Sequence, residues 1–208
     1  KLLPDFEDDI LHMYLPLGSI FPRRVIDMPL NEAAIAGIGF GLSLGDGDKC
    51  RARPIIEVQF SGFVRLMLHQ IEEHSRHYYR TQTLDVAPGV YLLPSGVGER
   101  IEFHRDVELS LFTNNPALIV AFPSTPQDYY DMFFASIASD KTVIFFTHLD
   151  LYRQPRVQEL LRRPPRKPLE EFGPRKVEQG KDITVVTYGR GVYECQKAVA
   201  LVRKKIPD

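Results

Sequence analysis

The chain has 208 residues, of which 44% are hydrophobic and 25% are charged, and this composition suits one well-packed α/β domain with part of a second. Its 26 basic and 27 acidic residues give a formal net charge of -1, so nucleic acid and anionic membrane surfaces are not expected as partners. No apolar run approaches the roughly 18–20 residues that a membrane helix needs, and residues 1–14 carry too many acidic side chains for a signal peptide. Cys50 and Cys195 form no CxxC pair, so we expect two reduced thiols.

Helical and strand patterns alternate along the first 150 residues. The apolar runs are short and nearly unbroken, as in strands that are buried on both faces of a parallel sheet. In chain order, the predicted elements are a helix over 30–44, a strand over 54–60, a helix over 62–82, a further candidate strand over 90–93, a strand over 117–122, a helix over 126–139 and a strand over 142–146. This alternation predicts an α/β fold with a doubly wound, mainly parallel sheet flanked by helices.

The character of the chain changes after Tyr152. Residues 155–181 are rich in proline and charge, which predicts a linker, and its basic stretch over 162–167 is interrupted by prolines and is interpreted as part of that linker. A strand is then expected over 183–188 and a helix over 192–205. One strand and one helix cannot bury a core of their own, so the predicted organisation is a domain over 1–154, a linker over 155–181 and the start of a second α/β domain over 182–208.

Several motifs follow one another in the order of a known family. They are Arg24–Glu32 (RVIDMPLNE) with Gly37 and Gly41 after it, Arg53–Phe63 (RPIIEVQFSGF), Phe122–Pro126 (FPSTP), Val143–Phe146 (VIFF) with Leu151–Arg153 (LYR), and Gly180–Gly189 (GKDITVVTYG). Together they resemble the beta subunit of the thiamin-diphosphate-dependent 2-oxo acid dehydrogenases that act on pyruvate and branched-chain 2-oxo acids. The resemblance covers nearly the whole chain from Arg24, and it implies that a first helix and strand would precede this chain and that most of a C-terminal domain would follow it.

The resemblance implies a transketolase-like, pyrimidine-binding domain that supplies half of an active site. An alpha subunit or fused alpha domain would hold the diphosphate of the cofactor through Mg²⁺, in an α₂β₂ assembly. The product acyl group would pass to a lipoyl transacylase, in the bacterial cytoplasm or the mitochondrial matrix. Gln59 resembles the branched-chain and general bacterial type more than the pyruvate type, which is a hint toward a branched-chain 2-oxo acid as substrate.

Glu32 is the principal candidate for catalysis and cofactor binding. Thiamin diphosphate is activated by its own aminopyrimidine once a carboxylate hydrogen-bonds a ring nitrogen, and a glutamate at a shielded helix start can supply this bond. Glu32 begins a predicted helix whose next turns are almost wholly apolar, where a charge without a purpose is costly. The alternative is an ordinary glutamate that the helix dipole stabilises.

The resemblance also places Gln59 and Phe63 in the pyrimidine pocket, with the aromatic ring stacking on the cofactor. Phe63 can equally be a core residue, because stacking needs only an apolar ring of that size. Glu57 in the same strand is interpreted as a structural carboxylate that needs a buried partner. Gly37 and Gly41 share one helix face and can admit another backbone or the cofactor, or serve close helix packing.

His104 lies 19 positions before Pro123, the spacing of the catalytic histidine in the resembling family. The resemblance implies that it faces the reacting centre and passes a proton to the lipoyl acceptor. However, Arg105 and Asp106 follow it where the family has serine and glutamine, so an ordinary loop histidine is the alternative. Arg105 is a weaker candidate for binding a substrate carboxylate.

No metal ligand is predicted in this chain, but one cation site of the family is altered. The family commonly holds a potassium ion just before the VIFF strand, and Lys141 stands where an asparagine ligand would be. One hypothesis is that its ammonium group replaces the ion, whereas the favoured interpretation is a solvated lysine in a turn. Glu73, His74 and His77 have a spacing that suits a metal, but the predicted helix also needs polar surface there, which is the favoured interpretation. Gly45–Lys49 echoes a diphosphate-binding motif without its later asparagine, and is interpreted as a turn.

Two other functions remain open. Transketolase and deoxyxylulose-phosphate synthase have similar pyrimidine domains, but normally carry both halves of the site on one long chain. A scaffold or regulatory relative could keep the fold and lose the pocket, and the altered residues after His104 favour it. Glu32 is evidence against the scaffold, because a carboxylate beside an apolar helix has little use in an empty pocket.

Overall fold

The computed structural model describes residues 17–44, 52–81, 87–96, 106–152 and 167–206. The described residues before Glu32 belong to a first unit, in which residues 17–20 are helical. The second unit, from Glu32 onward, contains α2 (Glu32–Leu44), β1 (Ile55–Glu57), η1 (Ser61–Met67), α3 (Leu68–Thr81), β2 (Gly89–Ser95), η2 (Glu108–Leu111), β3 (Leu118–Ala121), α5 (Pro126–Ala138), β4 (Thr142–His148), α6 (Leu149–Tyr152), η3 (Leu169–Glu171) and α7 (Gly191–Lys205).

The four strands form one parallel sheet in the order β1-β2-β4-β3. In the middle of the sheet, Tyr91 of β2 is in register with Ile56 of β1 and with Ile144 of β4. All seven residues of β2 are buried, as are the first six of β4. Strands that are covered on both faces need apolar residues on both, and this explains their unbroken apolar sequences.

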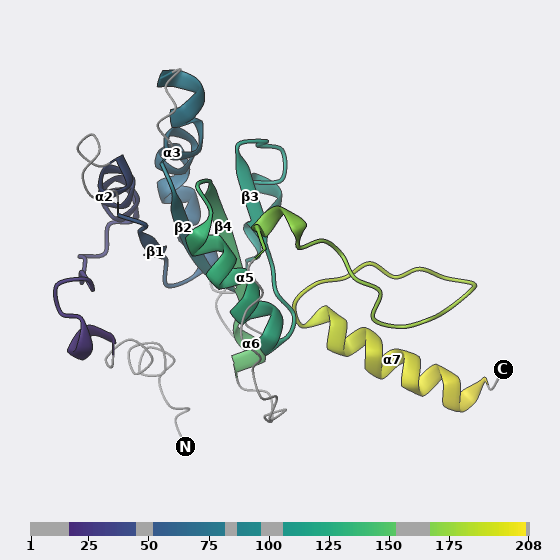
Figure 1. Ribbon diagram of the computed structural model, residues 1–208. Coiled ribbons are helices and arrows are strands. Elements are labelled where there is room, and N and C mark those ends of the chain that lie inside the picture. Colours follow the sequence, from purple (N-terminus) through teal and green to yellow (C-terminus); the bar gives the residue numbers. More distant parts are fainter. Residues whose placement is uncertain (1–16, 45–51, 82–86, 97–105, 153–166, 207–208) are drawn as a thin grey trace. The chain divides into compact units, whose positions relative to one another are not determined.

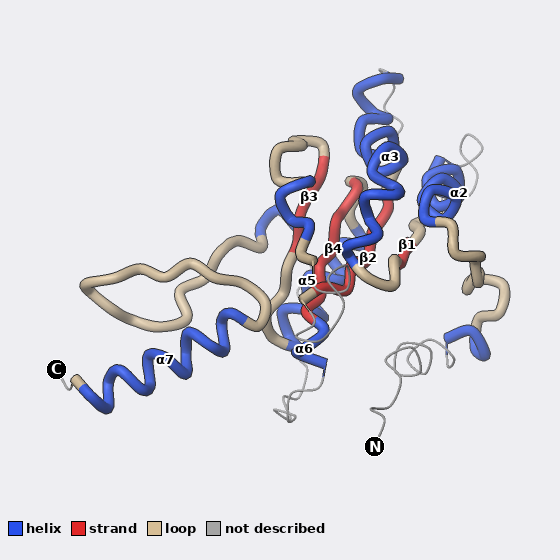
Figure 2. Tube along the Cα trace, turned by 180° about the vertical axis from the view of Figure 1, so that it is seen from behind, coloured by secondary structure: helices blue, strands red, loops and turns tan. Residues whose placement is uncertain are grey.

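Helices cover both faces of this sheet. On one face, Ala36 of α2, Val64 of η1 and Ile71 of α3 pack with Ile56, Tyr91, Leu93, Ile144 and Phe146 of the strands (Figure 2). On the other face, α5 and η3 pack with Val90, Leu92, Val143 and Phe145 (Figure 1). Right-handed crossovers predict this division, because the step from β3 back to β4 runs opposite to the steps from β1 to β2 and from β2 to β3. The prediction of a doubly wound α/β fold is confirmed.

The predicted elements of the first domain are found with changed boundaries. The helix predicted over 62–82 begins as the 3-10 helix η1 and continues as α3 to Thr81, and the candidate strand over 90–93 is the central strand β2. The strand predicted over 54–60 is shorter: β1 ends at Glu57, although the Val58 amide still donates to the Leu92 carbonyl at 3.1 Å. β1 is an edge strand of the described sheet, and η1 begins at Ser61, so the chain turns into a helix soon after β1 ends.

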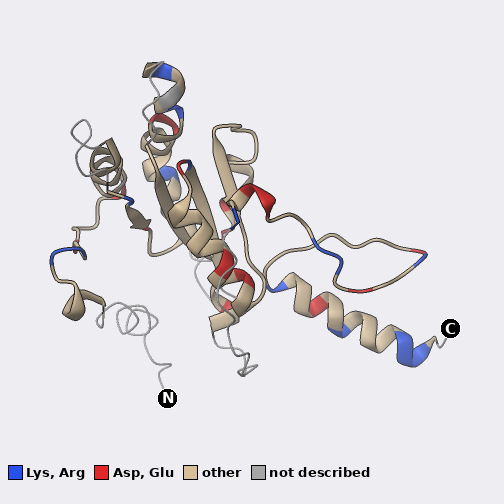
Figure 3. Cartoon of the chain, viewed as in Figure 1, with Lys and Arg blue, Asp and Glu red and all other residues tan. Residues whose placement is uncertain are grey.

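The strand predicted over 183–188 is wrong for this structure. The segment has no strand pairing, and Ile183, Val185 and Val186 are 82%, 65% and 87% exposed. A strand is stabilised by hydrogen bonds to a neighbouring strand, and none of the described strands pairs with residues 183–188. The predicted helix after it is confirmed as α7, which ends in three basic side chains that suit the negative end of the helix dipole (Figure 3).

The predicted linker is described from residue 167 onward. It is not wholly solvated, because Leu169 of η3 is 3% exposed and belongs to the core beside α5. Within the residues that the structure describes, every helix is too short or too polar to cross a membrane.

Candidate functional site

The candidate site lies at the edge of the sheet where the parallel strands end, here called the carboxyl edge. Ligands of open α/β sheets bind in the crevice outside this edge. Gln59 follows β1, Gly96 follows β2, Phe122 follows β3, and His148 is the last residue of β4. Of the four predicted catalytic and cofactor-binding residues, Glu32, Gln59 and Phe63 lie within the described residues, whereas His104 lies outside them.

The direction of α2 brings Glu32 to the carboxyl edge. Near the end of the helix, the Leu42 carbonyl accepts a hydrogen bond from the Ala52 amide at 3.2 Å, just before the chain enters β1. α2 therefore ends at the edge where the strands begin. Its first residue, Glu32, lies at the opposite end of the helix, toward the end of β1.

Glu32 also belongs to the helix face that packs on the sheet. The buried residues of α2 are Ala36, Gly39 and Ser43, and Glu32 precedes Ala36 by four positions on the same face. Contact is tight there, because a Cβ atom at Gly39 would lie 2.4 Å from Ile56. Glu32 is half-buried and is the only charged residue of α2 (Figure 3).

Gly37 and Gly41, the two glycines singled out in the sequence, lie away from the sheet, unlike Gly39. Cβ atoms at Gly37 and Gly41 would meet nothing within 4 Å. Ile38 and Leu42 on the same side are 46% and 45% exposed. Close packing of α2 on the sheet is therefore due to Gly39, and the face with Gly37 and Gly41 is open within the described structure.

Gln59 and Phe63 flank the start of η1. Both are half-buried, and between them Phe60 and Ser61 are buried. The Phe63 ring packs against the core cluster that contains Ala36 of α2, with its centroid 6.5 Å from that of Phe60. The structure thus brings η1 beside α2, and part of the Phe63 ring is left accessible.

The start of η1 is attached to the segment that follows residue 105. The Ser61 hydroxyl donates to the Asp106 carbonyl. Arg65 donates from Nε and from a terminal nitrogen to the two carboxylate oxygens of Glu108, each at 2.8 Å. Asp106 is two positions after His104 in the sequence, and His104 itself lies outside the described residues.

His148 at the end of β4 was not found by sequence reasoning. Its ring stacks on Phe122 with a centroid distance of 6.4 Å, and a Cβ atom at Gly96 would lie 2.6 Å from its Nε2. Burial lowers the pKa of His148, Asp150 raises it and Arg190 lowers it. Its Nδ1 is buried without a hydrogen-bond partner among the described residues. The only sequence signal was a polar residue that ends a buried strand.

The loop before β4 binds the cationic side chain of Arg53, a residue that precedes β1. Its guanidinium donates to the carbonyls of Ile137 and Ser139, the former at 3.1 Å, and to the Asp140 carboxylate at 2.6 Å. Lys141 instead lies 3.3 Å from the Glu170 carboxylate. The replacement of a potassium ion by Lys141 stays a prediction.

His74 forms part of a buried polar chain. It lies 3.1 Å from the Ser43 hydroxyl and 2.9 Å from the Tyr91 hydroxyl, and its ring stacks on Phe40. Burial lowers the pKa of His74 to about 4. Its ring nitrogens thus connect α2 and β2 to α3, and Glu73 beside it is paired with Arg80. No cluster of three potential metal ligands occurs in the described part of the chain.

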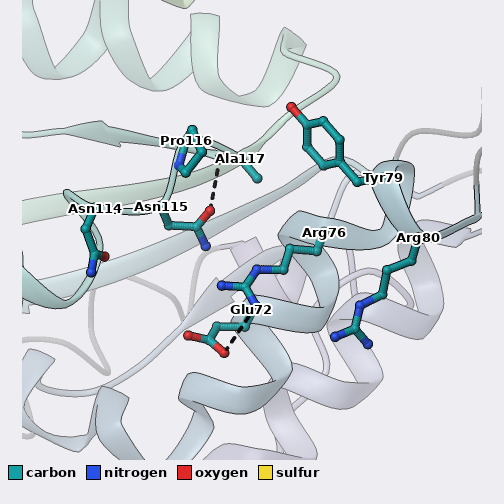
Figure 4. Close-up of a pocket in the computed structure, with 8 residues that line it drawn as sticks. All are labelled: Glu72, Arg76, Tyr79, Arg80, Asn114, Asn115, Pro116 and Ala117. Atoms are coloured by element: carbon teal, nitrogen blue, oxygen red, sulfur yellow. Dashed lines mark hydrogen bonds and ion pairs between the residues drawn. The ribbon is translucent and has the colours of Figure 1, made fainter.

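A hollow of about 410 Å³ lies elsewhere, between α3 and the chain that enters β3 (Figure 4). Its arginines have carboxylate partners, since Arg76 is 3.9 Å from Glu72 and Arg80 pairs with Glu73. Asn115 is occupied as well, because its carbonyl oxygen accepts from the Ala117 amide at 3.0 Å. This hollow is at the edge where β3 begins, so it is not part of the candidate site.

Curated relatives match most of the chain. The pyruvate dehydrogenase E1 component subunit beta of Bacillus subtilis is 33% identical over 184 residues, which are 87% of this chain and 54% of the relative. The same subunit of Staphylococcus aureus is 34% identical over 188 residues, again 87% of this chain and 54% of the relative. The 2-oxoisovalerate dehydrogenase subunit beta of Bacillus subtilis is 33% identical over 189 residues, or 88% and 54%. The chain spans about half the length of these relatives.

The family comparison covers most of the domain that contains the sheet. Residues 5–155 match the model of the transketolase pyrimidine-binding domain. This range includes α2, η1 and the four strands of the described sheet. It therefore contains the carboxyl edge of that sheet. The chain belongs to the family of transketolase pyrimidine-binding domains.

Proposed function

We propose that this chain is the pyrimidine-binding half of a thiamin-diphosphate-dependent 2-oxo acid dehydrogenase. The observation that carries the proposal is the position of Glu32, a half-buried carboxylate at the start of an otherwise uncharged helix, on its packed face and at the carboxyl edge. The family match and the names of the relatives support the same assignment.

The residues present fit the pyrimidine end of thiamin diphosphate. When bound, this cofactor would supply the electron sink that stabilises the carbanion left by loss of CO₂ from a 2-oxo acid. Glu32 would accept a hydrogen bond from the pyrimidine ring and so favour the tautomer that removes the thiazolium proton.

Phe63 and Gln59 would complete the pyrimidine pocket. The accessible part of the Phe63 ring offers an apolar surface for stacking, while the buried part fixes its orientation. Gln59 is half-buried, and its sequence neighbours Val58 and Phe60 are buried, so the backbone that carries Gln59 is anchored in the core. His104 remains a proposal from the resemblance, as the residue that faces the reacting centre.

An alpha half is the proposed partner. The open face of α2, with Gly37, Ile38, Gly41 and Leu42, is a surface of small and apolar side chains that a partner helix could cover. None of the residues proposed here would bind the cofactor diphosphate, which we assign, with its Mg²⁺, to the alpha half. We propose an α₂β₂-type assembly that passes the acyl group to a lipoyl transacylase core, in the bacterial cytoplasm or the mitochondrial matrix.

The substrate is a 2-oxo acid, and we propose a branched-chain acid in preference to pyruvate because of Gln59. The names of the relatives include both substrate types. The test is decarboxylation by the full-length protein with its alpha half, thiamin diphosphate and Mg²⁺, with pyruvate and with a branched-chain 2-oxo acid. A higher kcat/KM for the branched-chain acid is expected. A preference for pyruvate would overturn the substrate assignment alone, whereas a well-formed assembly that turns over neither acid would favour a non-catalytic relative.

A further inference from the structure

The ion pair between Arg65 and Glu108 joins the two 3-10 helices at the carboxyl edge. Both hydrogen bonds measure 2.8 Å and use the two oxygens of one carboxylate. Such a two-bond pair fixes the orientation of both groups as well as their distance, which a single bond between point charges does not.

Glu108 depends on this pair. Its side chain is only 10% exposed, whereas that of Arg65 is 60% exposed. Removing a carboxylate from water is unfavourable unless its oxygens are hydrogen-bonded, so Arg65 stabilises Glu108 in its buried position.

A second bond strengthens the same junction. Ser61, four residues before Arg65, donates to the carbonyl of Asp106, two residues before Glu108. Two attachments therefore hold η1 and the 106–108 segment in one relative position. Gln59 and Phe63 lie on either side of Ser61, so the junction restrains the backbone that carries both side chains.

We propose that Arg65 is a positioning residue for the cofactor pocket. By holding Glu108, it keeps the backbone from Gln59 to Phe63 in the geometry that receives the pyrimidine ring. This inference rests on the proposed function, because it takes Gln59 and Phe63 as the residues that contact the cofactor. Pockets lose affinity when their supporting contacts are removed, even though those contacts do not touch the ligand.

The experiment compares Arg65→Gln, Arg65→Lys and Arg175→Gln in the full-length protein assembled with its alpha half. Arg175 is a matched control, since it is 58% exposed and makes an equivalent two-bond pair with Asp128, with both distances 2.9 Å. Thiamin diphosphate affinity is measured by calorimetry in the presence of Mg²⁺, and KM for the cofactor and kcat at saturating cofactor are measured by decarboxylation.

For Arg65→Gln we expect the Kd and KM for thiamin diphosphate to rise about tenfold, with kcat at saturating cofactor within about twofold of the unmutated value. Arg65→Lys keeps the charge without the two-bond geometry and should give an intermediate Kd. Arg175→Gln should match the unmutated protein. If Arg65→Gln does not assemble, the Kd of Arg65→Lys decides by the same criterion.

An unchanged cofactor Kd in the Arg65 variants, or an equal rise in Arg175→Gln, would overturn the positioning role even if the melting temperature fell. These outcomes presuppose that the unmutated assembly binds thiamin diphosphate. If it binds none, the proposed function fails and this inference fails with it, so the two failures are distinguishable.

Discussion

Two ionisable side chains, Glu32 and His74, lie on packed surfaces of this fold with different consequences. Glu32 begins the packed face of α2 and is half-buried at the carboxyl edge, where a ligand can reach it. His74 is 1% exposed and satisfied by Ser43 and Tyr91, so we assign it a structural role. A polar group that is buried and fully paired specifies packing, whereas one at the rim of a crevice is available for chemistry.

The burial of His74 makes stability depend on pH. Its folded-state pKa of about 4 lies below the ordinary value of 6.5, so the unfolded state binds the proton first as the pH falls. The contribution is fully present above pH 6.5 and is lost between pH 6.5 and pH 4. The free energy of unfolding is therefore expected to fall by about 2 kcal/mol between pH 7 and pH 5 through His74 alone.

Urea denaturation of the full-length protein at these two pH values checks this prediction. His74→Gln, which has no ionisable group, should lower stability at pH 7 and reduce its loss on going to pH 5. His69→Gln is the control, because His69 is exposed on the same helix. An equal pH dependence in His74→Gln and the unmutated protein would refute the assignment.

At the scale of elements, α2 has two faces that are built for different neighbours. Gly39 lies against Ile56 of the sheet, and Gly41, two residues later, faces open space. The same residue type is thus required for packing at one position and is free of contact at the other.

Substitutions at these glycines should separate folding from assembly. Gly39→Ala should destabilise the protein by about 1–3 kcal/mol, because the new methyl group overlaps Ile56. Gly41→Leu should keep or raise the stability of this chain, since glycine is about 0.8–1 kcal/mol worse than a good helix former. It should also weaken association with the alpha half, as measured by analytical ultracentrifugation. Unimpaired association of Gly41→Leu would show that the open face of α2 is not the contact surface.

The elements that were predictable are those whose signal is local. β2 and β4 are buried on both faces, so their sequences are apolar throughout, and α5 has a proline and a capping box formed by Thr125 and Asp128 at its start. The strand over 183–188 was predicted wrongly for a related reason: its apolar residues fit a strand, but pairing depends on a second strand that local sequence does not reveal.

The long-range features of the site were not predictable. Arg65 and Glu108 are 43 residues apart, and neither forms a motif that announces the pair. His148 lies against Gly96 and Gly189, which are far apart in the sequence, so its surroundings could not be read from local sequence. Glu32, Gln59 and Phe63 were predicted as site residues on the strength of the resemblance, and their roles stay predictions.

At the scale of the whole molecule, the C-terminal segment contacts the carboxyl edge of the sheet through the residues just before α7. Tyr188 packs on Phe122 with ring centroids 4.9 Å apart, and Arg190 pairs with Asp150. Between them, Gly189 has φ +55°, a conformation that glycine adopts without cost. The segment that leads into α7 therefore meets the sheet beside His148.

Gly189→Val should release this attachment. A β-branched residue is strained at this φ by about 1–2 kcal/mol, and its Cβ would lie 3.1 Å from Phe122. We expect faster tryptic cleavage after Arg175, Lys176 and Lys181, measured by mass spectrometry. Gly173→Val is the control, because a Cβ there meets nothing within 4 Å. Identical cleavage rates for the two variants would contradict the attachment.

The central claim is that Glu32 activates thiamin diphosphate. Its most direct test is the decarboxylation rate of the full-length assembly with Glu32→Gln, compared with Glu72→Gln on the exposed side of α3. We predict that kcat falls by about 10²–10⁴-fold in Glu32→Gln, because the amide cannot hold the pyrimidine as the carboxylate does, and stays near the unmutated value in Glu72→Gln. A Glu32→Gln assembly that binds the cofactor and retains its full rate would contradict the account.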